Sequence, residues 1–395
     1  MSMPSTDHAA SSRTAPAARD YVFTFSYESL ADARRRGMMR PPDRLVSTLM
    51  TSPEVNRLLI ADAYRAWGTA WRREPFDFLV RPRQTQKVRH VRPLRSERAD
   101  PEDVAAIEQV YVNYEGTIRD AADRAHLDEP RFITANPLVA GFCDLSWAGP
   151  ALYYGRDDWL SSPARRQYWP AYREAYARLA RSGRAVAAVS QEIIDRIEPE
   201  GPHLVVPNGI EPEEWLGDQP APPEWFARIP GPRAVYVGTL DSRLDIDGLY
   251  DLATRRPDLQ LVLLGPIPDK TFLERAAALA NVHVHGSVNR RHVVAVLRNA
   301  ELTLLSHQRT ALTKAMSPLK VYEYLAAGRP VLATDLRPVR GLGPRVHLAP
   351  TVSDFADLVD VALSQGVQDE AERVAFVEDN AWAARHRSIL TLVNG

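Results

Sequence analysis

The second half of the chain alternates short apolar runs with stretches of helical spacing, and no other feature of the sequence restricts the fold as much. Strands are predicted at Ala234–Val237, Leu259–Leu264, Val282–His285 and Leu302–Leu305. Helices are predicted between them at Ile246–Arg256, Phe272–Ala280 and Arg291–Asn299. This alternation predicts an α/β fold built on a parallel, doubly wound sheet. Ligands of such sheets bind beyond the carboxyl ends of the strands, where the strand order reverses.

The first half follows a similar but less regular pattern. Strands are predicted at Tyr21–Phe25, Phe76–Val80, Arg131–Thr134 and Ala185–Val189, and helices at Glu102–Ala125 and Arg166–Arg181. A proline-rich segment follows Pro207 and predicts a linker. A chain of 395 residues is long for one hydrophobic core, so two domains are expected. Residues 1–20, rich in Ala, Ser and Pro, are predicted to be a disordered tail.

Composition excludes several classes of protein. The net charge of −1 gives no overall attraction to nucleic acid or to an anionic membrane. Cys143 is the only cysteine, which excludes an intrachain disulfide and a cysteine-rich metal site. No apolar run approaches the roughly 18–20 residues that span a bilayer, and no signal peptide is recognised. The predicted location is the cytoplasm.

The run from Ser317 to Val331 carries the clearest indication of chemistry. Ser317 and Pro318 favour a helix start, and the helix is predicted to run from Pro318 to Ala327 and to end at Gly328. Lys320 and Glu323 are three residues apart and share one helix face, close to a helix N-terminus that attracts anions. This grouping suits a nucleotide diphosphate, with phosphates near the positive end and ribose hydroxyls near the carboxylate. An ordinary capped helix is the alternative.

This run resembles the donor-site helix of GT-B glycosyltransferases of the retaining family-four type, in the bacterial surface-polysaccharide (teichuronic-acid-type) branch. The resemblance covers Pro207 to the C-terminus well, Ile133–Gly209 moderately and the first 130 residues poorly. It implies two Rossmann-like domains with a deep cleft: an acceptor domain at 21–206 and a donor domain at 207–365. Residues 366–395 would form a C-terminal helix that crosses back to the N-terminal domain.

The resemblance also implies a reaction. The chain would transfer a sugar, with retention, from a nucleotide-diphosphate sugar to a hydroxyl acceptor, which would be a glycan, a glycolipid or a small molecule. Leaving-group charge would be stabilised electrostatically, so neither a metal nor a separate cofactor is expected. The alternatives left open are a non-catalytic GT-B subunit that binds nucleotide sugar or glycan, a nucleotide-sugar epimerase and an inverting transferase.

Two glycines end predicted strands on the donor side. Gly238 lets backbone N–H groups approach a phosphate, and Arg243 offers a forked contact to it. The run Val237–Asp247 is similar to the corresponding loop of the polysaccharide branch. Gly265 stands where the family receives base and ribose, although a bare strand-ending turn is the favoured interpretation of Gly265 itself. Ala315 departs from the family pattern, because classical members carry a sugar-binding glutamate there.

Two segments of the first half are also candidates for function. Asp157 and Asp158 lie in a segment that resembles the cleft-facing segment of the family, where a carboxylate orients the acceptor or acts as an inverting base. A helix N-cap is the alternative role for either. The basic stretch from Arg81 to Arg98 is expected to be a solvated loop with a short strand at Val88–Val91, and peripheral contact with the inner face of the membrane is left open.

Overall fold

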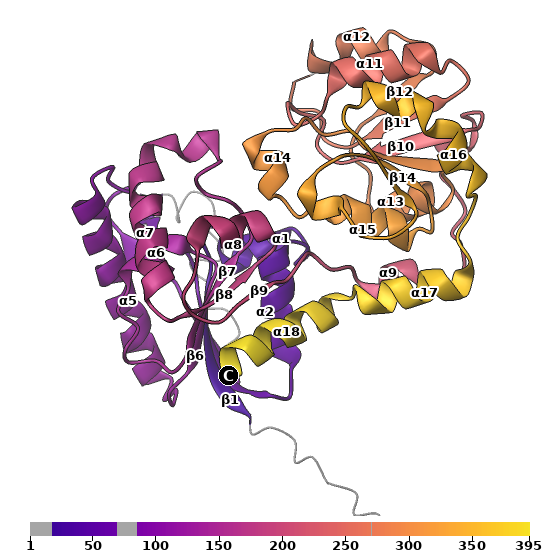
Figure 1. The fold of residues 1–395 in the computed structure, drawn as a ribbon. Helices are drawn as coiled ribbons and strands as arrows, with labels where there is room; N and C mark the ends of the chain where they lie inside the picture. The colour runs from indigo at the N-terminus through magenta and orange to yellow at the C-terminus, as the bar shows by residue number, and fades with distance from the viewer. Residues whose placement is uncertain (1–17, 69–84, 270) are drawn as a thin grey trace, which may run out of the picture.

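The chain folds around two parallel β-sheets, each covered by helices on both faces (Figure 1). The computed structural model describes residues 18–68, 85–269 and 271–395. The N-terminal sheet has seven strands in the order β4-β2-β1-β6-β7-β8-β9, and the C-terminal sheet has six in the order β12-β11-β10-β13-β14-β15. Each sheet has its own hydrophobic core. The predicted strand at Phe76–Val80 and most of the predicted tail lie outside the described residues.

The N-terminal domain alternates strands and helices along the chain. Its strands are β1 (Arg19–Thr24), β2 (Val55–Ala61), β4 (Val88–Val91), β6 (Arg131–Thr134), β7 (Ala151–Gly155), β8 (Ala185–Ala188) and β9 (His203–Val205). Its longer helices are α2 (Pro41–Thr51), α5 (Val104–Arg124) and α7 (Trp169–Arg181), with shorter ones at α1 (Leu30–Arg35), α6 (Pro137–Phe142) and α8 (Gln191–Ile197). The short strands β3 (Arg65–Ala66) and β5 (Leu94–Arg95) pair with each other.

The C-terminal domain follows the predicted alternation closely. Its strands are β10 (Arg233–Val237), β11 (Gln260–Leu264), β12 (Val282–His285), β13 (Leu302–Leu305), β14 (Val331–Thr334) and β15 (Val346–Ala349). The helices around them are α11 (Ile246–Arg255), α12 (Glu274–Ala277), α13 (Arg290–Arg298), α14 (Ala311–Ala315), α15 (Leu319–Ala326) and α16 (Val359–Ser364). Two short helices, α9 (Pro212–Trp215) and α10 (Glu224–Ala227), lie in the proline-rich linker.

Strand order places a ligand crevice in each domain. In the C-terminal sheet, β10 lies between β11, which follows it in sequence, and β13, which comes later, so the order reverses there. In the N-terminal sheet, the corresponding reversal lies at β1, between β2 and β6. Ligands of doubly wound sheets bind outside the carboxyl ends of the strands at such points. The loop after Val237 is therefore the first place to look for a site.

The C-terminal segment is two helices rather than the single helix predicted within residues 366–395. Helix α17 (Glu370–Asp379) packs on α15 in the C-terminal domain, whereas α18 (Trp382–Asn394) contacts α2, β6 and β8 in the N-terminal domain (Figure 1). The break has a backbone cause. Ile210 donates to Asn380 O at 3.0 Å and accepts from the Trp382 N–H at 2.9 Å, which holds Ala381 in an extended conformation. The chain thus crosses to the N-terminal domain at residues 380–382, later than position 366.

Side chains secure the returning helix at both ends. Thr48 Oγ1 of α2 lies 2.6 Å from His386 Nδ1, and Asn394 Nδ2 donates to the hydroxyl of Tyr21 at 3.1 Å. His386 is fully buried, and burial together with the charge of Arg44 lowers its pKa to about 3. A neutral imidazole therefore completes this packing at physiological pH. In the described residues, no helix is both long and apolar enough to cross a membrane.

Arg373 of α17 joins three separate elements inside the C-terminal domain. Its side chain is 1% exposed, and its Nη1 donates to the backbone oxygens of Trp215 and Ala326 at 2.8 Å each. Glu370 binds the rest of the guanidinium, with Nε to Oε2 at 2.8 Å. A buried guanidinium of this kind is stable because each of its edges has an acceptor.

Replacing Arg373 by methionine should lower the free energy of unfolding by about 2–4 kcal/mol, because two buried carbonyls lose their donor. Arg387, an exposed arginine of α18, provides the control, and Arg387→Met should change stability by less than about 0.5 kcal/mol. Thermal unfolding followed by circular dichroism measures both. Equal melting temperatures for the two variants would show that Arg373 contributes no more than a surface arginine.

Candidate active site

Two glycines bring the ends of β10 and β11 into contact. Gly238 and Gly265 have φ angles of +151° and +149°, a backbone conformation that residues other than glycine rarely adopt. A Cβ on Gly265 would lie 2.7 Å from the carbonyl carbon of Gly238, and a Cβ on Gly238 would collide with the Lys320 side chain. Both positions therefore require glycine.

Lys320 projects from the first turn of α15 onto this pair of strand ends. Its Nζ lies 5.3 Å from the centre of the Tyr236 ring, and the side chain is partly buried rather than exposed. Burial, reinforced by the nearby charge of Arg243, lowers the pKa of Lys320 to about 8. Tyr324 on the same helix accepts the N–H of Val237 through its hydroxyl at 3.0 Å, which fixes α15 against the end of β10.

Arg243 lies in the loop after Gly238 and is held by a forked ion pair. Its Nε and Nη2 contact Asp241 Oδ1 and Oδ2 at 2.9 and 2.7 Å. Burial alone would raise the pKa of Asp241, but the hydrogen bonds from Arg243 hold it below its ordinary value. The loop is also fixed by backbone bonds, because Gln308 N donates to Arg243 O at 2.8 Å. The guanidinium remains about a third exposed, so it can still reach a ligand.

His307 lies beneath these cations and is 1% exposed. Its Nε2 is 3.4 Å from the hydroxyl of Tyr236, and burial with the charges of Lys320 and Arg243 lowers its pKa to about 3. The ring is neutral at physiological pH and supports the loop rather than supplying charge. Arg309, two residues further along the chain, is exposed.

Glu323 lies one helical turn beyond Lys320 and is 7% exposed. Its Oε1 is 2.6 Å from Nη1 of Arg290, the first residue of α13. Burial raises the pKa of Glu323, and the charge of Arg290 opposes that rise. The sequence correctly placed Lys320 and Glu323 on one face, but it contained no indication that Arg290 would pair with Glu323.

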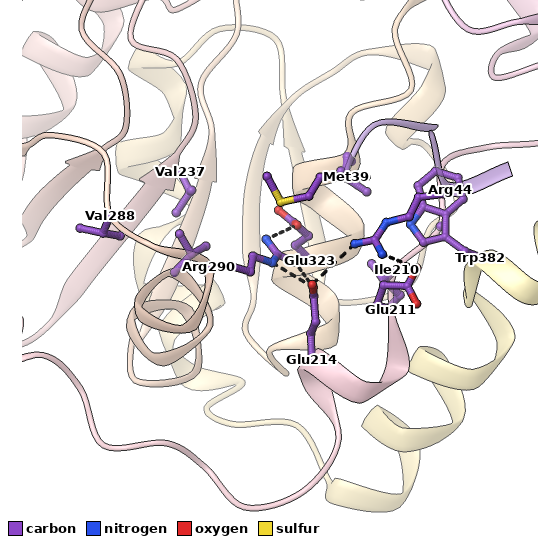
Figure 2. A pocket seen from close by; sticks show the side chains of 13 residues that line it. Met39, Arg44, Ile210, Glu211, Glu214, Val237, Val288, Arg290, Glu323 and Trp382 are labelled. Atoms are coloured by element: carbon purple, nitrogen blue, oxygen red, sulfur yellow. Dashed lines mark hydrogen bonds and ion pairs between the residues drawn. The ribbon is translucent and has the colours of Figure 1, made fainter. Parts of the chain in front are cut away.

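A cavity of about 290 Å³ lies beside Glu323, between the two domains. Figure 2 shows the side chains of Glu323, Arg290, Glu214, Arg44 and Glu211 beside it, in a series of contacts in which the charge alternates in sign. Its apolar lining comes from Met39, Ile210, Val237, Val288, Val293, Leu319 and Trp382. An apolar slot with a few convergent charged groups is typical of a small-molecule site.

Ser317 does not cap the donor helix as predicted. The helix begins at Leu319 with Pro318 as its N-cap and without a side-chain cap, and the Ser317 hydroxyl accepts the N–H of Asn208 at 3.1 Å. Asn208 returns a bond to Ser317 O at 2.7 Å, so the pair ties the linker to the helix start. Ser317 lies one residue before the N-cap Pro318, so its hydroxyl is not next to the free N–H groups of the first helical turn. It binds the linker instead.

The approach to the donor helix contacts the N-terminal domain at Ala315. Ser190, at the end of β8, donates its hydroxyl to Ala315 O at 2.7 Å. Arg337 of the C-terminal domain adds an ion pair to Asp195 of α8 at 2.7 Å. The position where classical relatives carry a glutamate is therefore a point of contact between domains, made through its backbone.

The two aspartates of the first domain lie in different environments. Asp157 is 48% exposed on its side chain, and its Oδ2 lies 3.4 Å from Nε of Arg156. Asp158 has a fully buried side chain that accepts the N–H of Leu160 at 3.2 Å and pairs with Arg196 at 3.1 Å. This arrangement leaves Asp158 in a structural role, closer to the capping alternative, and leaves only Asp157 accessible to an acceptor.

The described residues contain no cluster of three or more His, Cys, Asp or Glu side chains that could hold a metal ion. Asp245, which has the spacing of a metal pair with Asp247, caps α11 by accepting the N–H of Gly248 at 3.0 Å. Of the basic stretch, the described part contains the predicted strand at Val88–Val91, and Lys87 donates to Ser52 O at 2.6 Å. Arg81 and Arg83 lie outside the described residues.

Comparison with known proteins gives matches of three kinds. Residues 231–364 match the family described as "Glycosyl transferases group 1". TuaH of Bacillus subtilis (strain 168), which carries the provisional name of a teichuronic acid biosynthesis glycosyltransferase, is 25% identical over 205 residues. That match covers 49% of this chain and 49% of TuaH, so the chain spans about half the length of this curated relative.

Solved structures match nearly the whole chain in shape. OtsA, a trehalose-6-phosphate synthase, has a TM-score of 0.65 at 11% identity and covers 95% of this chain and 99% of its own. An Anabaena protein, HepE, solved in complex with UDP, has a TM-score of 0.62 at 12% identity over 94% of this chain and 98% of its own. An E. coli trehalose-6-phosphate protein with bound UDP-2-fluoro glucose has a TM-score of 0.64 at 10% identity, over 94% of this chain and 98% of its own. At these identities the likeness concerns the fold.

The contact between the two strand ends generates a prediction. Gly265→Ala should lower the free energy of unfolding by about 1–3 kcal/mol, because the added methyl group meets the Gly238 backbone in a strained conformation. Gly286 follows the next strand with nothing near its Cβ position, so Gly286→Ala is the matched control and should be close to neutral. Chemical denaturation compares the two. If Gly265→Ala left the free energy of unfolding unchanged, the backbone at Gly238 would be able to move away from the added methyl group at little cost.

The family match covers the domain in which Gly238, Lys320 and Glu323 meet, and the structural matches extend over both domains and the returning helix. Residues 231–364 match the glycosyl transferases group 1 family, and the two Rossmann-like domains with their crossing C-terminal helix form a GT-B fold.

Proposed function

We propose that this protein transfers a sugar from a nucleotide-diphosphate sugar to a hydroxyl acceptor. One observation carries the proposal: two cations, Lys320 and Arg243, lie with Gly238 at the strand ends, one helical turn from the buried carboxylate of Glu323. A diphosphate placed on the cations would bring its ribose to Glu323 and its base into the apolar cavity. The UDP complex of HepE and the UDP-sugar complex of the E. coli protein, which share this fold, support a donor of this class.

The chemical task of such a site is to stabilise the departing diphosphate. Negative charge builds on the phosphate oxygens as the sugar–phosphate bond breaks, and preorganised cations lower the energy of that state. Lys320 and Arg243 would provide the charge without rearrangement, since Tyr236 and Asp241 already position them. The neutral His307 beneath them adds no charge. No step in this scheme requires a metal ion.

Retention of anomeric configuration is part of the proposal. An inverting enzyme needs a carboxylate or imidazole free to take the acceptor proton. The buried Asp158 is already paired with Arg196, and Asp157 lies beside Arg156. In a retaining reaction the departing phosphate can take that proton on the same face, so Asp157 would only orient the acceptor. The name of TuaH favours a glycan or glycolipid acceptor of the cell surface.

A non-catalytic GT-B subunit is the remaining rival, motivated by Ala315 in place of a sugar-binding carboxylate. The intact cation pair counts against it, because a partly buried lysine with a lowered pKa is costly to keep in a scaffold. Peripheral membrane contact through the basic stretch remains a prediction.

Lys320 provides a test of the reaction. The wild-type protein should release nucleoside diphosphate from at least one of a UDP-, a GDP-, an ADP- and a TDP-sugar. The rate of release from that donor should fall roughly 10²–10³-fold in Lys320→Ala. With Lys320 charged only below its pKa of about 8, kcat/KM should decline as the pH rises through 8. Lys320→Arg keeps its charge and should lose this decline. A folded Lys320→Ala protein with normal turnover would remove Lys320 from the diphosphate site.

Product stereochemistry tests retention. The anomeric proton signal of the product, measured by NMR, should show the configuration of the donor sugar. Asp157→Asn should reduce turnover by less than about tenfold, since a true general base contributes about 10²–10⁴-fold. An inverted product together with an inactive Asp157→Asn variant would establish an inverting mechanism with Asp157 as base.

A further inference from the structure

Arg290 lies between two carboxylates at the edge of the cavity (Figure 2). Its Nη1 contacts Glu323 Oε1 at 2.6 Å, while its Nε and Nη2 both contact Glu214 Oε2, at 2.9 and 2.6 Å. Arg290 contacts Glu323 through Oε1, no hydrogen bond to Oε2 is seen within the described residues, and Glu323 lines the cavity. Oε2 is therefore the oxygen that a ligand in the cavity can meet, and the contact with Arg290 fixes the direction in which it points.

The position of Arg290 is itself determined by its surroundings. It is the first residue of α13, whose start is capped by Asn289 through a bond from the His292 N–H at 2.9 Å. Its guanidinium lies 5.2 Å from the ring centre of Trp215, a fully buried residue of α9. With its backbone capped and its head group on an aromatic face, Arg290 loses little further freedom on binding a carboxylate.

The network continues into the other domain. Arg44 of α2 contacts Glu211 at 2.9 Å and Glu214 at 3.7 Å, so Glu214 receives positive charge from both sides. The order Arg44, Glu214, Arg290, Glu323 alternates in sign from the N-terminal domain to the donor helix. Each carboxylate in this series adjoins an arginine.

Glu323 needs such a partner in order to act as an acceptor. A protonated carboxyl accepts weakly, and burial drives Glu323 toward that form. The charged groups that face it are Arg290 of α13, Glu214 of α9 and Lys320 of its own helix. Arg290 makes direct contact, whereas Glu214 opposes ionisation.

We propose that Arg290 is a positioning residue for the nucleotide: it holds the Glu323 carboxylate so that its second oxygen accepts the ribose hydroxyls of the donor. This inference rests on the proposed function and adds a residue to it. Arg290 does not touch the reacting atoms in this arrangement, and its effect on the ligand passes through Glu323. Its removal should therefore weaken donor binding rather than slow the chemical step.

The test measures the affinity of the full-length protein for UDP, GDP, ADP and TDP by calorimetry and continues with the nucleotide that binds most tightly. Arg290→Met should weaken that affinity about ten- to a hundredfold, as the loss of a hydrogen bond to a charged group does. The pH at which binding is lost on acidification should move upward, because Glu323 protonates more readily. Arg290→Lys restores a charge without the fork and should recover part of the affinity. KM for the donor sugar should rise while kcat changes little.

A nucleotide that lacks the ribose hydroxyls distinguishes a positioning role of Arg290 from a general effect on the structure. An analogue of the same nucleotide without ribose hydroxyls should bind wild type and Arg290→Met with nearly equal affinity, since the contact through Glu323 no longer exists. Arg291→Met removes the neighbouring exposed arginine and should leave both affinities unchanged. If Arg290→Met fails to fold by circular dichroism, Arg290→Lys carries the same comparison, with a smaller expected loss.

The results can contradict the positioning role of Arg290 without contradicting the proposed transferase function. Tight nucleotide binding by wild type, with equal losses for the normal and the hydroxyl-free nucleotide in the Arg290 variants, would overturn the positioning role and leave the proposed function intact. An unshifted pH profile would do the same. Failure of the wild-type protein to bind any of the four nucleotides would overturn both.

Discussion

The crossing of the chain between its domains is the constraint on which the cavity depends. Ile210 on the outward linker pairs with residues 380–382 on the return, and Gly209 packs so closely that a Cβ there would lie 2.9 Å from Trp382 N. Ile210, Gly209 and Trp382 then form part of the cavity wall. Two backbone hydrogen bonds contribute only about 0.5–1.5 kcal/mol each to the stability of this crossing. Arg373 adds a buried contact close by, because it donates to the backbone oxygens of Trp215 in α9 and Ala326 in α15.

Charges on the donor side are arranged for two different tasks. At the strand ends, cations predominate: Lys320 and Arg243 share only Asp241, and the repulsion between them contributes to the low pKa of the lysine. At the cavity, charges alternate in sign, and a carboxylate is left with one open oxygen. The first arrangement suits an incoming polyanion, since binding relieves the repulsion. The second suits neutral hydroxyls, which add hydrogen bonds without adding charge.

The first domain contributes contacts rather than known chemistry to this site. Ser190 reaches Ala315 O, Arg337 reaches Asp195, and Arg44 reaches the acids of the linker. These three contacts are polar, as contacts between domains of one chain often are. The carboxylate network crosses the same boundary, so the surroundings of Glu323 and the relative position of the domains depend on one set of ion pairs.

Local sequence by itself determined the α/β alternation, the shared face of Lys320 and Glu323, and the strands at Val282–His285 and Leu302–Leu305, because periodicity and helical spacing are properties of neighbouring residues. It did not predict β2, whose Asn56 and Arg57 interrupt the apolar pattern. Tertiary structure alone decided that Ser317 binds the linker, that a helix breaks at Ala381 and that Arg290 meets Glu323. Each of these outcomes depends on a partner remote in sequence, which no local pattern specifies.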